Sequence, residues 1–183
     1  MRAHHRKIVT SVGAGVLAAG LGLSGLSPAS ATTASTSTTS STASTATATA
    51  TISRSTIISR ARTWVTAHVP YNQQGYHRDP QGKLYREDCS GYVSMAWHLR
   101  TSYVTSTLPQ VSHRITKTQL RPGDVMLKTS GHVVIFNGWA NTAHTKYNAM
   151  EESRPGVGTV ARVTPYPYWS GQGTFVPYRL NGL

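Results

Sequence analysis

The chain is poor in cysteine and in acidic residues, and most of its length lacks a long apolar segment. Cys89 is the only cysteine among 183 residues, so an intramolecular disulfide and a cysteine-rich zinc site are both excluded. No apolar run of about 18 residues, the length that suggests a membrane span, lies beyond residue 30. These absences exclude a zinc finger, a disulfide-stapled miniprotein and a channel.

Acidic residues number only 6 against 18 lysines and arginines, so the formal net charge is +12. Such a protein is attracted over long range to anionic polymers, for example bacterial wall polymers, a membrane surface or nucleic acid. The sequence contains no run of five like charges and no basic–aromatic repeat. We therefore expect no specific nucleic-acid interface.

Residues 1–31 are expected to be an export signal. A basic start at residues 2–7 precedes an apolar stretch at residues 8–26, and Ala29-Ser30-Ala31 fits the small-residue pattern of a cleavage site. An N-terminal membrane anchor is the alternative interpretation. Cleavage would remove three basic residues and no acidic ones, which leaves a secreted or wall-associated protein of net charge +9 without a transmembrane anchor.

Residues 32–51 contain only Thr, Ser and Ala. Such a tract has no large apolar side chain to bury, so it cannot offset the entropy lost on ordering. We therefore expect a disordered linker over residues 32–52. The remaining residues, 53–183, are enough for one domain with a sizeable core, and a monomer is expected.

A first helix is predicted near the start of this domain. Ser53 or Ser55 can cap it, and its apolar residues from Ile57 to Val65 recur with helical spacing. Val69-Pro70 would end the helix, because the residue before a proline disfavours helical geometry.

The stretch Tyr71–Glu87 is rich in Gly, Asn, Gln, Asp and Pro, which indicates a long surface loop. Asp88 can cap a second helix that runs to about Leu99. Thereafter the pattern is typical of short strands, at residues 124–127, 132–137, 147–152, 159–163 and 175–178. This order predicts an α+β fold with N-terminal helices packed on a small antiparallel β-sheet. Three aromatic residues near the C-terminus are expected to pack against the sheet, with a place beside the substrate groove as the alternative: Tyr166, Tyr168 and Trp169.

The most informative segment for chemistry is Asp88-Cys89-Ser90-Gly91. It places a thiol in the first turn of a predicted helix, where free N–H groups and the helix dipole favour an anion. This position favours the thiolate, which is the nucleophilic form. A buried cysteine that packs as a small hydrophobic residue is the alternative, although the polar flanking residues argue against a core position.

A thiolate nucleophile needs an acid–base partner, usually histidine. His132 is the best-placed candidate, because it opens the apolar strand His132–Phe136 directly after Gly131. The start of a strand beside a helix N-terminus is a suitable meeting point for the two groups. The other histidines after residue 31 lie at a helix end, in loops or beside polar residues.

Four segments occur in order along the domain: Tyr71, Asp88-Cys89-Ser90-Gly91-Tyr92-Val93, Leu120-Arg121-Pro122-Gly123-Asp124-Val125 and Gly131-His132-Val133-Val134-Ile135-Phe136. In combination they resemble the NlpC/P60 family. Its members are secreted cysteine peptidases that cut peptidoglycan stem peptides and have a papain-like core. The resemblance spans roughly Ile57 to Tyr178, which is nearly the whole folded region.

The resemblance implies that Cys89 is the nucleophile and that His132 is the general base and later the acid. Tyr71 matches a tyrosine beside the active site, whereas Asp88 and Ser90 match positions that help to hold the stem peptide in some members. We therefore expect Tyr71, Asp88 and Ser90 to bind substrate. No metal or organic cofactor is implied.

The chain departs from the family at the residue that orients the catalytic histidine. Members usually have a histidine on the strand after the one that opens with the catalytic histidine, whereas Glu151 falls nearest that position here. A carboxylate can accept the ring N–H and stabilise the imidazolium, and the related CHAP amidases tend to place an acid there. Glu152, on the opposite face, is the main competitor. Either glutamate could instead be an exposed charge on an edge strand.

The expected function is a secreted cysteine peptidase or amidase that hydrolyses peptide bonds in peptidoglycan stem peptides. Its positive charge would retain it on anionic cell-wall polymers. One alternative is a CHAP-like amidase or an acyl transferase of the same superfamily. The other is a non-catalytic wall-binding protein on the same fold. Because Cys89 precedes His132 in the chain, the circularly permuted relatives that act on lipids do not fit.

Overall fold

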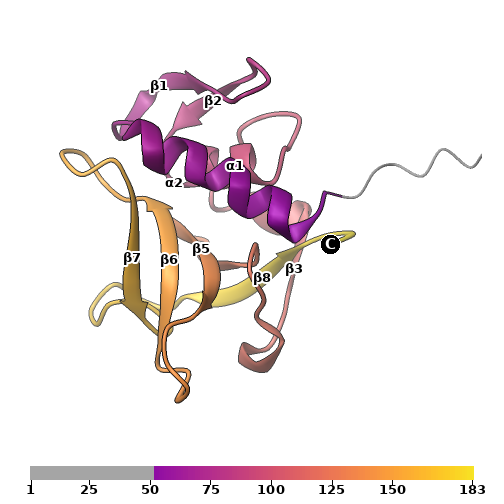
Figure 1. Cartoon of the computed structure of the whole chain (residues 1–183), viewed down its shortest axis with the longest axis vertical. Coiled ribbons are helices and arrows are strands. Elements are labelled where there is room, and N and C mark those ends of the chain that lie inside the picture. The colour runs from indigo at the N-terminus through magenta and orange to yellow at the C-terminus, as the bar shows by residue number, and fades with distance from the viewer. Residues whose placement is uncertain (1–51) are drawn as a thin grey trace, which may run out of the picture. The chain divides into compact units, whose positions relative to one another are not determined.

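The computed structural model describes residues 52–183, which contain two α-helices and eight β-strands (Figure 1). The predicted export signal and residues 32–51 of the predicted linker lie outside the described residues. Ile52, the last residue of that predicted linker, is half-buried against the core. No helix within residues 52–183 is long and apolar enough to cross a membrane.

Both predicted helices are present. Helix α1 (Arg54–Ala67) begins at Ser53, whose hydroxyl accepts a hydrogen bond from a backbone amide of the first turn. Helix α2 (Cys89–Ala96) begins at Asp88, which caps it in the same way. This second helix ends three residues before the predicted limit, because the backbone turns there and the amide of Leu99 bonds back to a carbonyl of the last helical turn.

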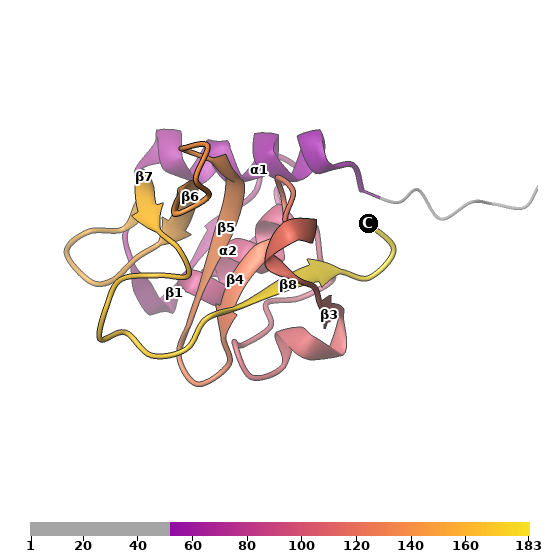
Figure 2. The same ribbon diagram turned by 90° about the horizontal axis from the view of Figure 1, so that it is seen from below.

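Six strands form one antiparallel sheet in the order β3-β8-β4-β5-β6-β7 (Figure 2). Their bounds are β3 (Ser112–Arg114), β4 (Val125–Lys128), β5 (His132–Trp139), β6 (Lys146–Glu152), β7 (Thr159–Pro165) and β8 (Val176–Leu180). The predicted α+β class with a small antiparallel sheet is therefore confirmed. Strand β3 was not predicted, because three residues are too few to show a strand periodicity.

The surface loop predicted for Tyr71–Glu87 is wrong. This segment forms an antiparallel hairpin of β1 (Asn72–Arg78) and β2 (Leu84–Glu87), seen beyond the helices in Figure 1. Its strands are largely polar and exposed, so they lack the apolar alternation that reveals a half-buried strand. The turn is fixed by Asp79, which pairs with Arg60 of α1 at 2.7 Å and accepts two backbone N–H bonds.

The sheet separates two apolar clusters. Helix α2 packs on β5 and β6, and α1 packs on β6 and β7, which encloses the larger cluster. Along β5, Val133 and Ile135 face the helices, whereas Val134 and Phe136 belong to the smaller cluster on the other face. The same alternation places each polar residue at a strand end on one of the two sheet faces. Only polar side chains on the same face can contact each other.

Candidate functional site

Cys89 is the first residue of α2, and its thiol lies close to the turn between β4 and β5. Its Sγ is 3.9 Å from the carbonyl oxygen of Gly131. The side chain is nearly buried, with 4% of its surface exposed, so the expectation that polar neighbours keep it out of the core is wrong. The Cys89 amide belongs to the first helical turn, where backbone N–H groups have no acceptor within the helix.

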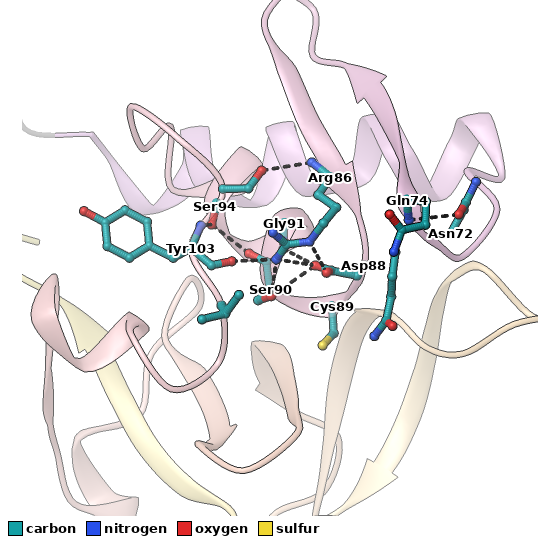
Figure 3. Close-up of polar contacts among 12 residues, drawn as sticks. Asn72, Gln74, Arg86, Asp88, Cys89, Ser90, Gly91, Ser94 and Tyr103 are labelled. Atoms are coloured by element: carbon teal, nitrogen blue, oxygen red, sulfur yellow. Dashed lines mark hydrogen bonds and ion pairs between the residues drawn. The ribbon is translucent and has the colours of Figure 1, made fainter.

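The predicted substrate ligands Asp88 and Ser90 are occupied by contacts within the protein (Figure 3). The carboxylate of Asp88 accepts hydrogen bonds from the Gly91 amide at 2.7 Å and from the Ser90 hydroxyl at 3.0 Å. Arg86 pairs with the same carboxylate and also donates to Ser90 Oγ at 3.1 Å. Both residues are buried, and their contacts position the start of α2, while the Cys89 sulfur points away from them.

A close backbone approach explains the glycine in this segment. A Cβ atom on Gly91 would lie 2.0 Å from the carbonyl oxygen of Arg86, so only glycine lets β2 pass this close to the helix. The strand that supplies Arg86 is thereby held against the turn of α2 that carries Cys89.

The imidazole of His132 bridges the thiol and a carboxylate. Its Nε2 lies 2.7 Å from Oε2 of Glu151, so Nδ1 is the ring nitrogen left for Cys89, whose Sγ lies 3.9 Å from the carbonyl oxygen of the preceding residue, Gly131. Burial disfavours the charged ring, but the hydrogen bonds and charges of Cys89 and Glu151 outweigh it and raise the pKa of His132 to about 9. The imidazolium is therefore the favoured form at neutral pH.

Glu151 meets His132 because of strand register. The cross-strand pairs of β5 with β6 put Glu151 on the sheet face of His132, away from the helices. Both glutamates are buried on a central strand, so the alternative of an exposed edge-strand charge is wrong.

Two further side chains hold the carboxylate of Glu151. Tyr168 donates to Oε2 at 2.7 Å, and Arg162 of β7 donates from Nε to Oε1 at 2.8 Å. Burial alone would raise the pKa of Glu151, but the hydrogen bonds from His132 and Tyr168, together with the positive charges of His132 and Arg162, lower it. Glu151 is therefore held ionised, with one oxygen turned to the imidazole. Neither Arg162 nor Tyr168 was identified from the sequence as a site residue.

Glu152 points to the opposite face, towards the helices. One of its oxygens accepts a hydrogen bond from Thr159, and the other has no hydrogen-bond partner within the described residues. Burial and the nearby charges of Glu87 and Asp88 outweigh the Thr159 hydrogen bond and raise the pKa of Glu152 to about 7. It does not contact His132, so only Glu151 has the geometry expected of the orienting residue.

A cavity of about 440 Å³ opens beside His132. Tyr71 lies in its wall, and burial together with the neighbouring charge of Cys89 raises the pKa of Tyr71. Tyr71 therefore lies in the same cavity wall as His132, and its contact with substrate stays a prediction. Other residues complete the lining: Lys128, Gly131, Ser153, Arg154, Arg162, Tyr168, Trp169, Gln172 and Phe175.

The expectation that the C-terminal aromatic residues pack against the sheet holds for Tyr166 and Tyr168, which both pack on the smaller apolar cluster. Tyr168 contacts His132, with ring centroids 5.6 Å apart, and Trp169 is 44% exposed at the cavity. Their loop follows β7 and returns over the end of β5. No periodic pattern marks such a loop, so the sequence could not show which aromatic side chains reach the site.

The assembled chemistry is a cysteine sulfur, an imidazolium and an ionised carboxylate in sequence, beside an open cavity. Such an arrangement can deliver a thiolate to an electrophilic carbon and return a proton to a leaving group. Within residues 52–183, no group of three or more His, Cys, Asp and Glu side chains is arranged to hold a metal ion.

Comparison with known proteins adds no assignment: no protein-family model matches this chain, and no curated protein matches it significantly.

Proposed function

We propose that residues 53–183 form a papain-like cysteine peptidase or amidase of the NlpC/P60 type, which hydrolyses peptide bonds in peptidoglycan stem peptides outside the cell. The observation that carries this proposal is the placement of Cys89 beside Gly131–His132, with His132 bonded to Glu151 and Glu151 held by Arg162 and Tyr168. A buried cysteine that only packs would not need a histidine and a carboxylate aligned behind it.

In the proposed reaction, the thiolate of Cys89 attacks the carbonyl carbon of the scissile peptide bond. The backbone N–H of Cys89 donates to the developing oxyanion, an interaction of the kind that contributes about 3 kcal/mol to transition-state stabilisation. The imidazolium of His132 then protonates the departing amine, which leaves a thioester. His132, now neutral, removes a proton from water, and the hydroxide attacks the thioester, which releases the acyl fragment and regenerates the thiolate beside the imidazolium.

The remaining residues are assigned positioning roles in this proposal. Glu151 keeps the imidazole in one orientation and stabilises its positive charge. Asp88 and Ser90 fix the start of the helix that presents Cys89. Their predicted contact with substrate stays a prediction, whereas Tyr71 lies in the cavity wall and is available to a bound peptide.

Charge supports the proposed location. With 6 acidic residues against the 15 basic ones expected after cleavage of the export signal (18 − 3), the protein would concentrate on anionic wall polymers by long-range attraction. Retention there would be weakened by salt, because screening shortens the range of that attraction.

Purified peptidoglycan incubated with the protein tests the proposal, with Cys89→Ala and His132→Ala as matched controls. We expect new soluble fragments with the unmutated protein alone, and their masses identify the bond. A cut between glycan and peptide would favour the CHAP-like amidase, and a fragment joined to an added amine would favour acyl transfer. If the protein binds the wall under reducing conditions but releases no products, the non-catalytic wall-binding protein becomes the favoured alternative.

A further inference from the structure

The cavity beside His132 has a positively charged lining. Lys128, Arg154 and Arg162 contribute cationic side chains, and no aspartate or glutamate is among the residues of the described chain that line it. The Glu151 carboxylate, which contacts three of the lining residues, is buried and already shared by His132, Tyr168 and Arg162. The cavity therefore presents a field that favours an anion.

Two of these cations are available to a ligand. Lys128 donates one hydrogen bond from Nζ to the Gln172 carbonyl at 2.9 Å, which leaves two of its three N–H groups. Arg154 is exposed, and its guanidinium forms no hydrogen bond or ion pair with residues 52–183. Arg162, in contrast, is committed to Glu151.

The walls beside these cations are aromatic. Trp169 is 44% exposed, and the ring of Phe175 lies 5.9 Å from Lys128 Nζ. An anionic group joined to an organic fragment therefore fits this lining better than a free inorganic ion does, since the fragment would cover exposed aromatic surface while its charge meets Arg154 and Lys128.

The position of His132 indicates which part of a substrate would enter. In the proposed reaction the imidazolium protonates the departing amine, so the leaving fragment lies on the His132 side of the scissile bond. The cavity begins at that ring and continues over Lys128 and Gln172. It is thus the space in which the leaving fragment would lie.

We propose that this cavity binds a carboxylate of the leaving peptide fragment, with Arg154 and Lys128 as the residues that determine this specificity. The inference rests on the proposed peptidase function, because that reaction defines the leaving side. Arg154 can hold a carboxylate through two parallel N–H bonds, whereas Lys128 contributes a point charge.

Equilibrium binding to the Cys89→Ala variant tests this, because that variant cannot turn the ligand over. The probes are a stem tripeptide with a free C-terminal carboxylate and the same peptide as its carboxamide. We expect the acid to bind at least tenfold more tightly. Adding Arg154→Gln or Lys128→Gln should reduce that preference at least threefold, and Arg100→Gln, which removes an exposed charge outside the cavity, should not change it.

Equal binding of acid and amide would overturn the inference, as would a preference that neither variant reduces. Preferential binding of glycerol phosphate, an anionic unit of wall polymers, over both peptides would overturn it as well. The unmutated protein is assayed for hydrolysis of the same pair. If it cleaves neither peptide while Cys89→Ala still prefers the acid, the proposed reaction is rejected and the carboxylate site stands.

Discussion

Tyr168 donates its hydroxyl to the same Glu151 oxygen that faces His132 Nε2, and both distances are 2.7 Å. A single carboxylate oxygen thus receives a phenol from a C-terminal loop and an imidazole from β5. Because Arg162 occupies the other oxygen, the carboxylate cannot rotate without breaking at least one of these contacts. The orientation of His132 depends on a loop that is distant in sequence.

Replacement of Tyr168 by phenylalanine tests this relationship. The ring stays in the cavity wall, but Glu151 loses a donor that lowers its pKa. We expect the hydrolysis rate near pH 6 to fall about five- to tenfold, as for the loss of one hydrogen bond to a charged group. The acid limb of the pH–rate profile should move to higher pH. Tyr166→Phe, which does not touch Glu151, is the control, and an unshifted acid limb in Tyr168→Phe would contradict the assignment.

The raised pKa of His132 sets the alkaline limit of activity. The imidazolium donates the proton to the leaving amine, so kcat/KM should decline as pH rises through about 9. Glu151→Gln removes a negative charge that raises this pKa, and the decline should then begin at lower pH. The NMR chemical shifts of the His132 ring protons across pH 5–10 measure the same ionisation without a substrate. An unchanged alkaline limb in Glu151→Gln would be evidence against the coupling.

The same ionisation affects stability. The pKa of His132 is raised from 6.5 in an unfolded chain to about 9 in the fold, so its contribution to the free energy of unfolding is fully present below pH 6.5. That contribution is lost as pH rises through 9. Urea denaturation measures the free energy of unfolding at pH 6 and at pH 10. We expect this free energy to fall less between the two pH values in His132→Ala than in the unmutated protein.

Local patterns in the sequence were sufficient for the helices and most strands. The caps at Ser53 and Asp88, and the alternation in β5, are properties of neighbouring residues. Alternation places Glu151 and Glu152 on opposite faces, but which of them meets His132 depends on the register of β5 with β6. The hairpin of β1 and β2 was missed because its strands expose polar side chains, and its turn depends on the distant Arg60.

Arg162 and Tyr168 could not be assigned from the sequence for a different reason. Arg162 reaches Glu151 only through the register of β6 with β7, in which Ala149 pairs with Arg162. Tyr168 reaches it through the path of an irregular loop. Neither the register nor the path is encoded in the spacing of residues next to them, so three-dimensional placement was needed to find both contacts.

The raised pKa of Glu152 predicts a second pH dependence, which affects the free energy of unfolding and not the catalytic rate. Its pKa is raised from 4.5 to about 7 in the fold, so the stability associated with its protonated form is present below pH 4.5 and is lost as pH rises through 7. Glu152→Gln cannot ionise, and we expect it to gain stability relative to the unmutated protein between pH 5 and pH 8. Urea titrations at several pH values measure this difference, in which the shared contribution of His132 cancels. A difference that stays constant with pH would refute the assignment.

Asp124, in the turn that enters β4, is predicted to hold the helix and sheet together. Its buried carboxylate pairs with Arg54 of α1 at 2.9 Å and with Arg179 of β8 at 2.8 Å. Asp124→Asn leaves both guanidinium groups without their counter-charge, and we expect the free energy of unfolding to fall by about 3 kcal/mol, as when one partner of a buried ion pair is removed. Arg54→Ala should cost less, because Arg54 is partly exposed and Arg179 still pairs with Asp124. Chemical denaturation compares the two, and the prediction fails if the loss in Asp124→Asn is no larger than that in Arg54→Ala.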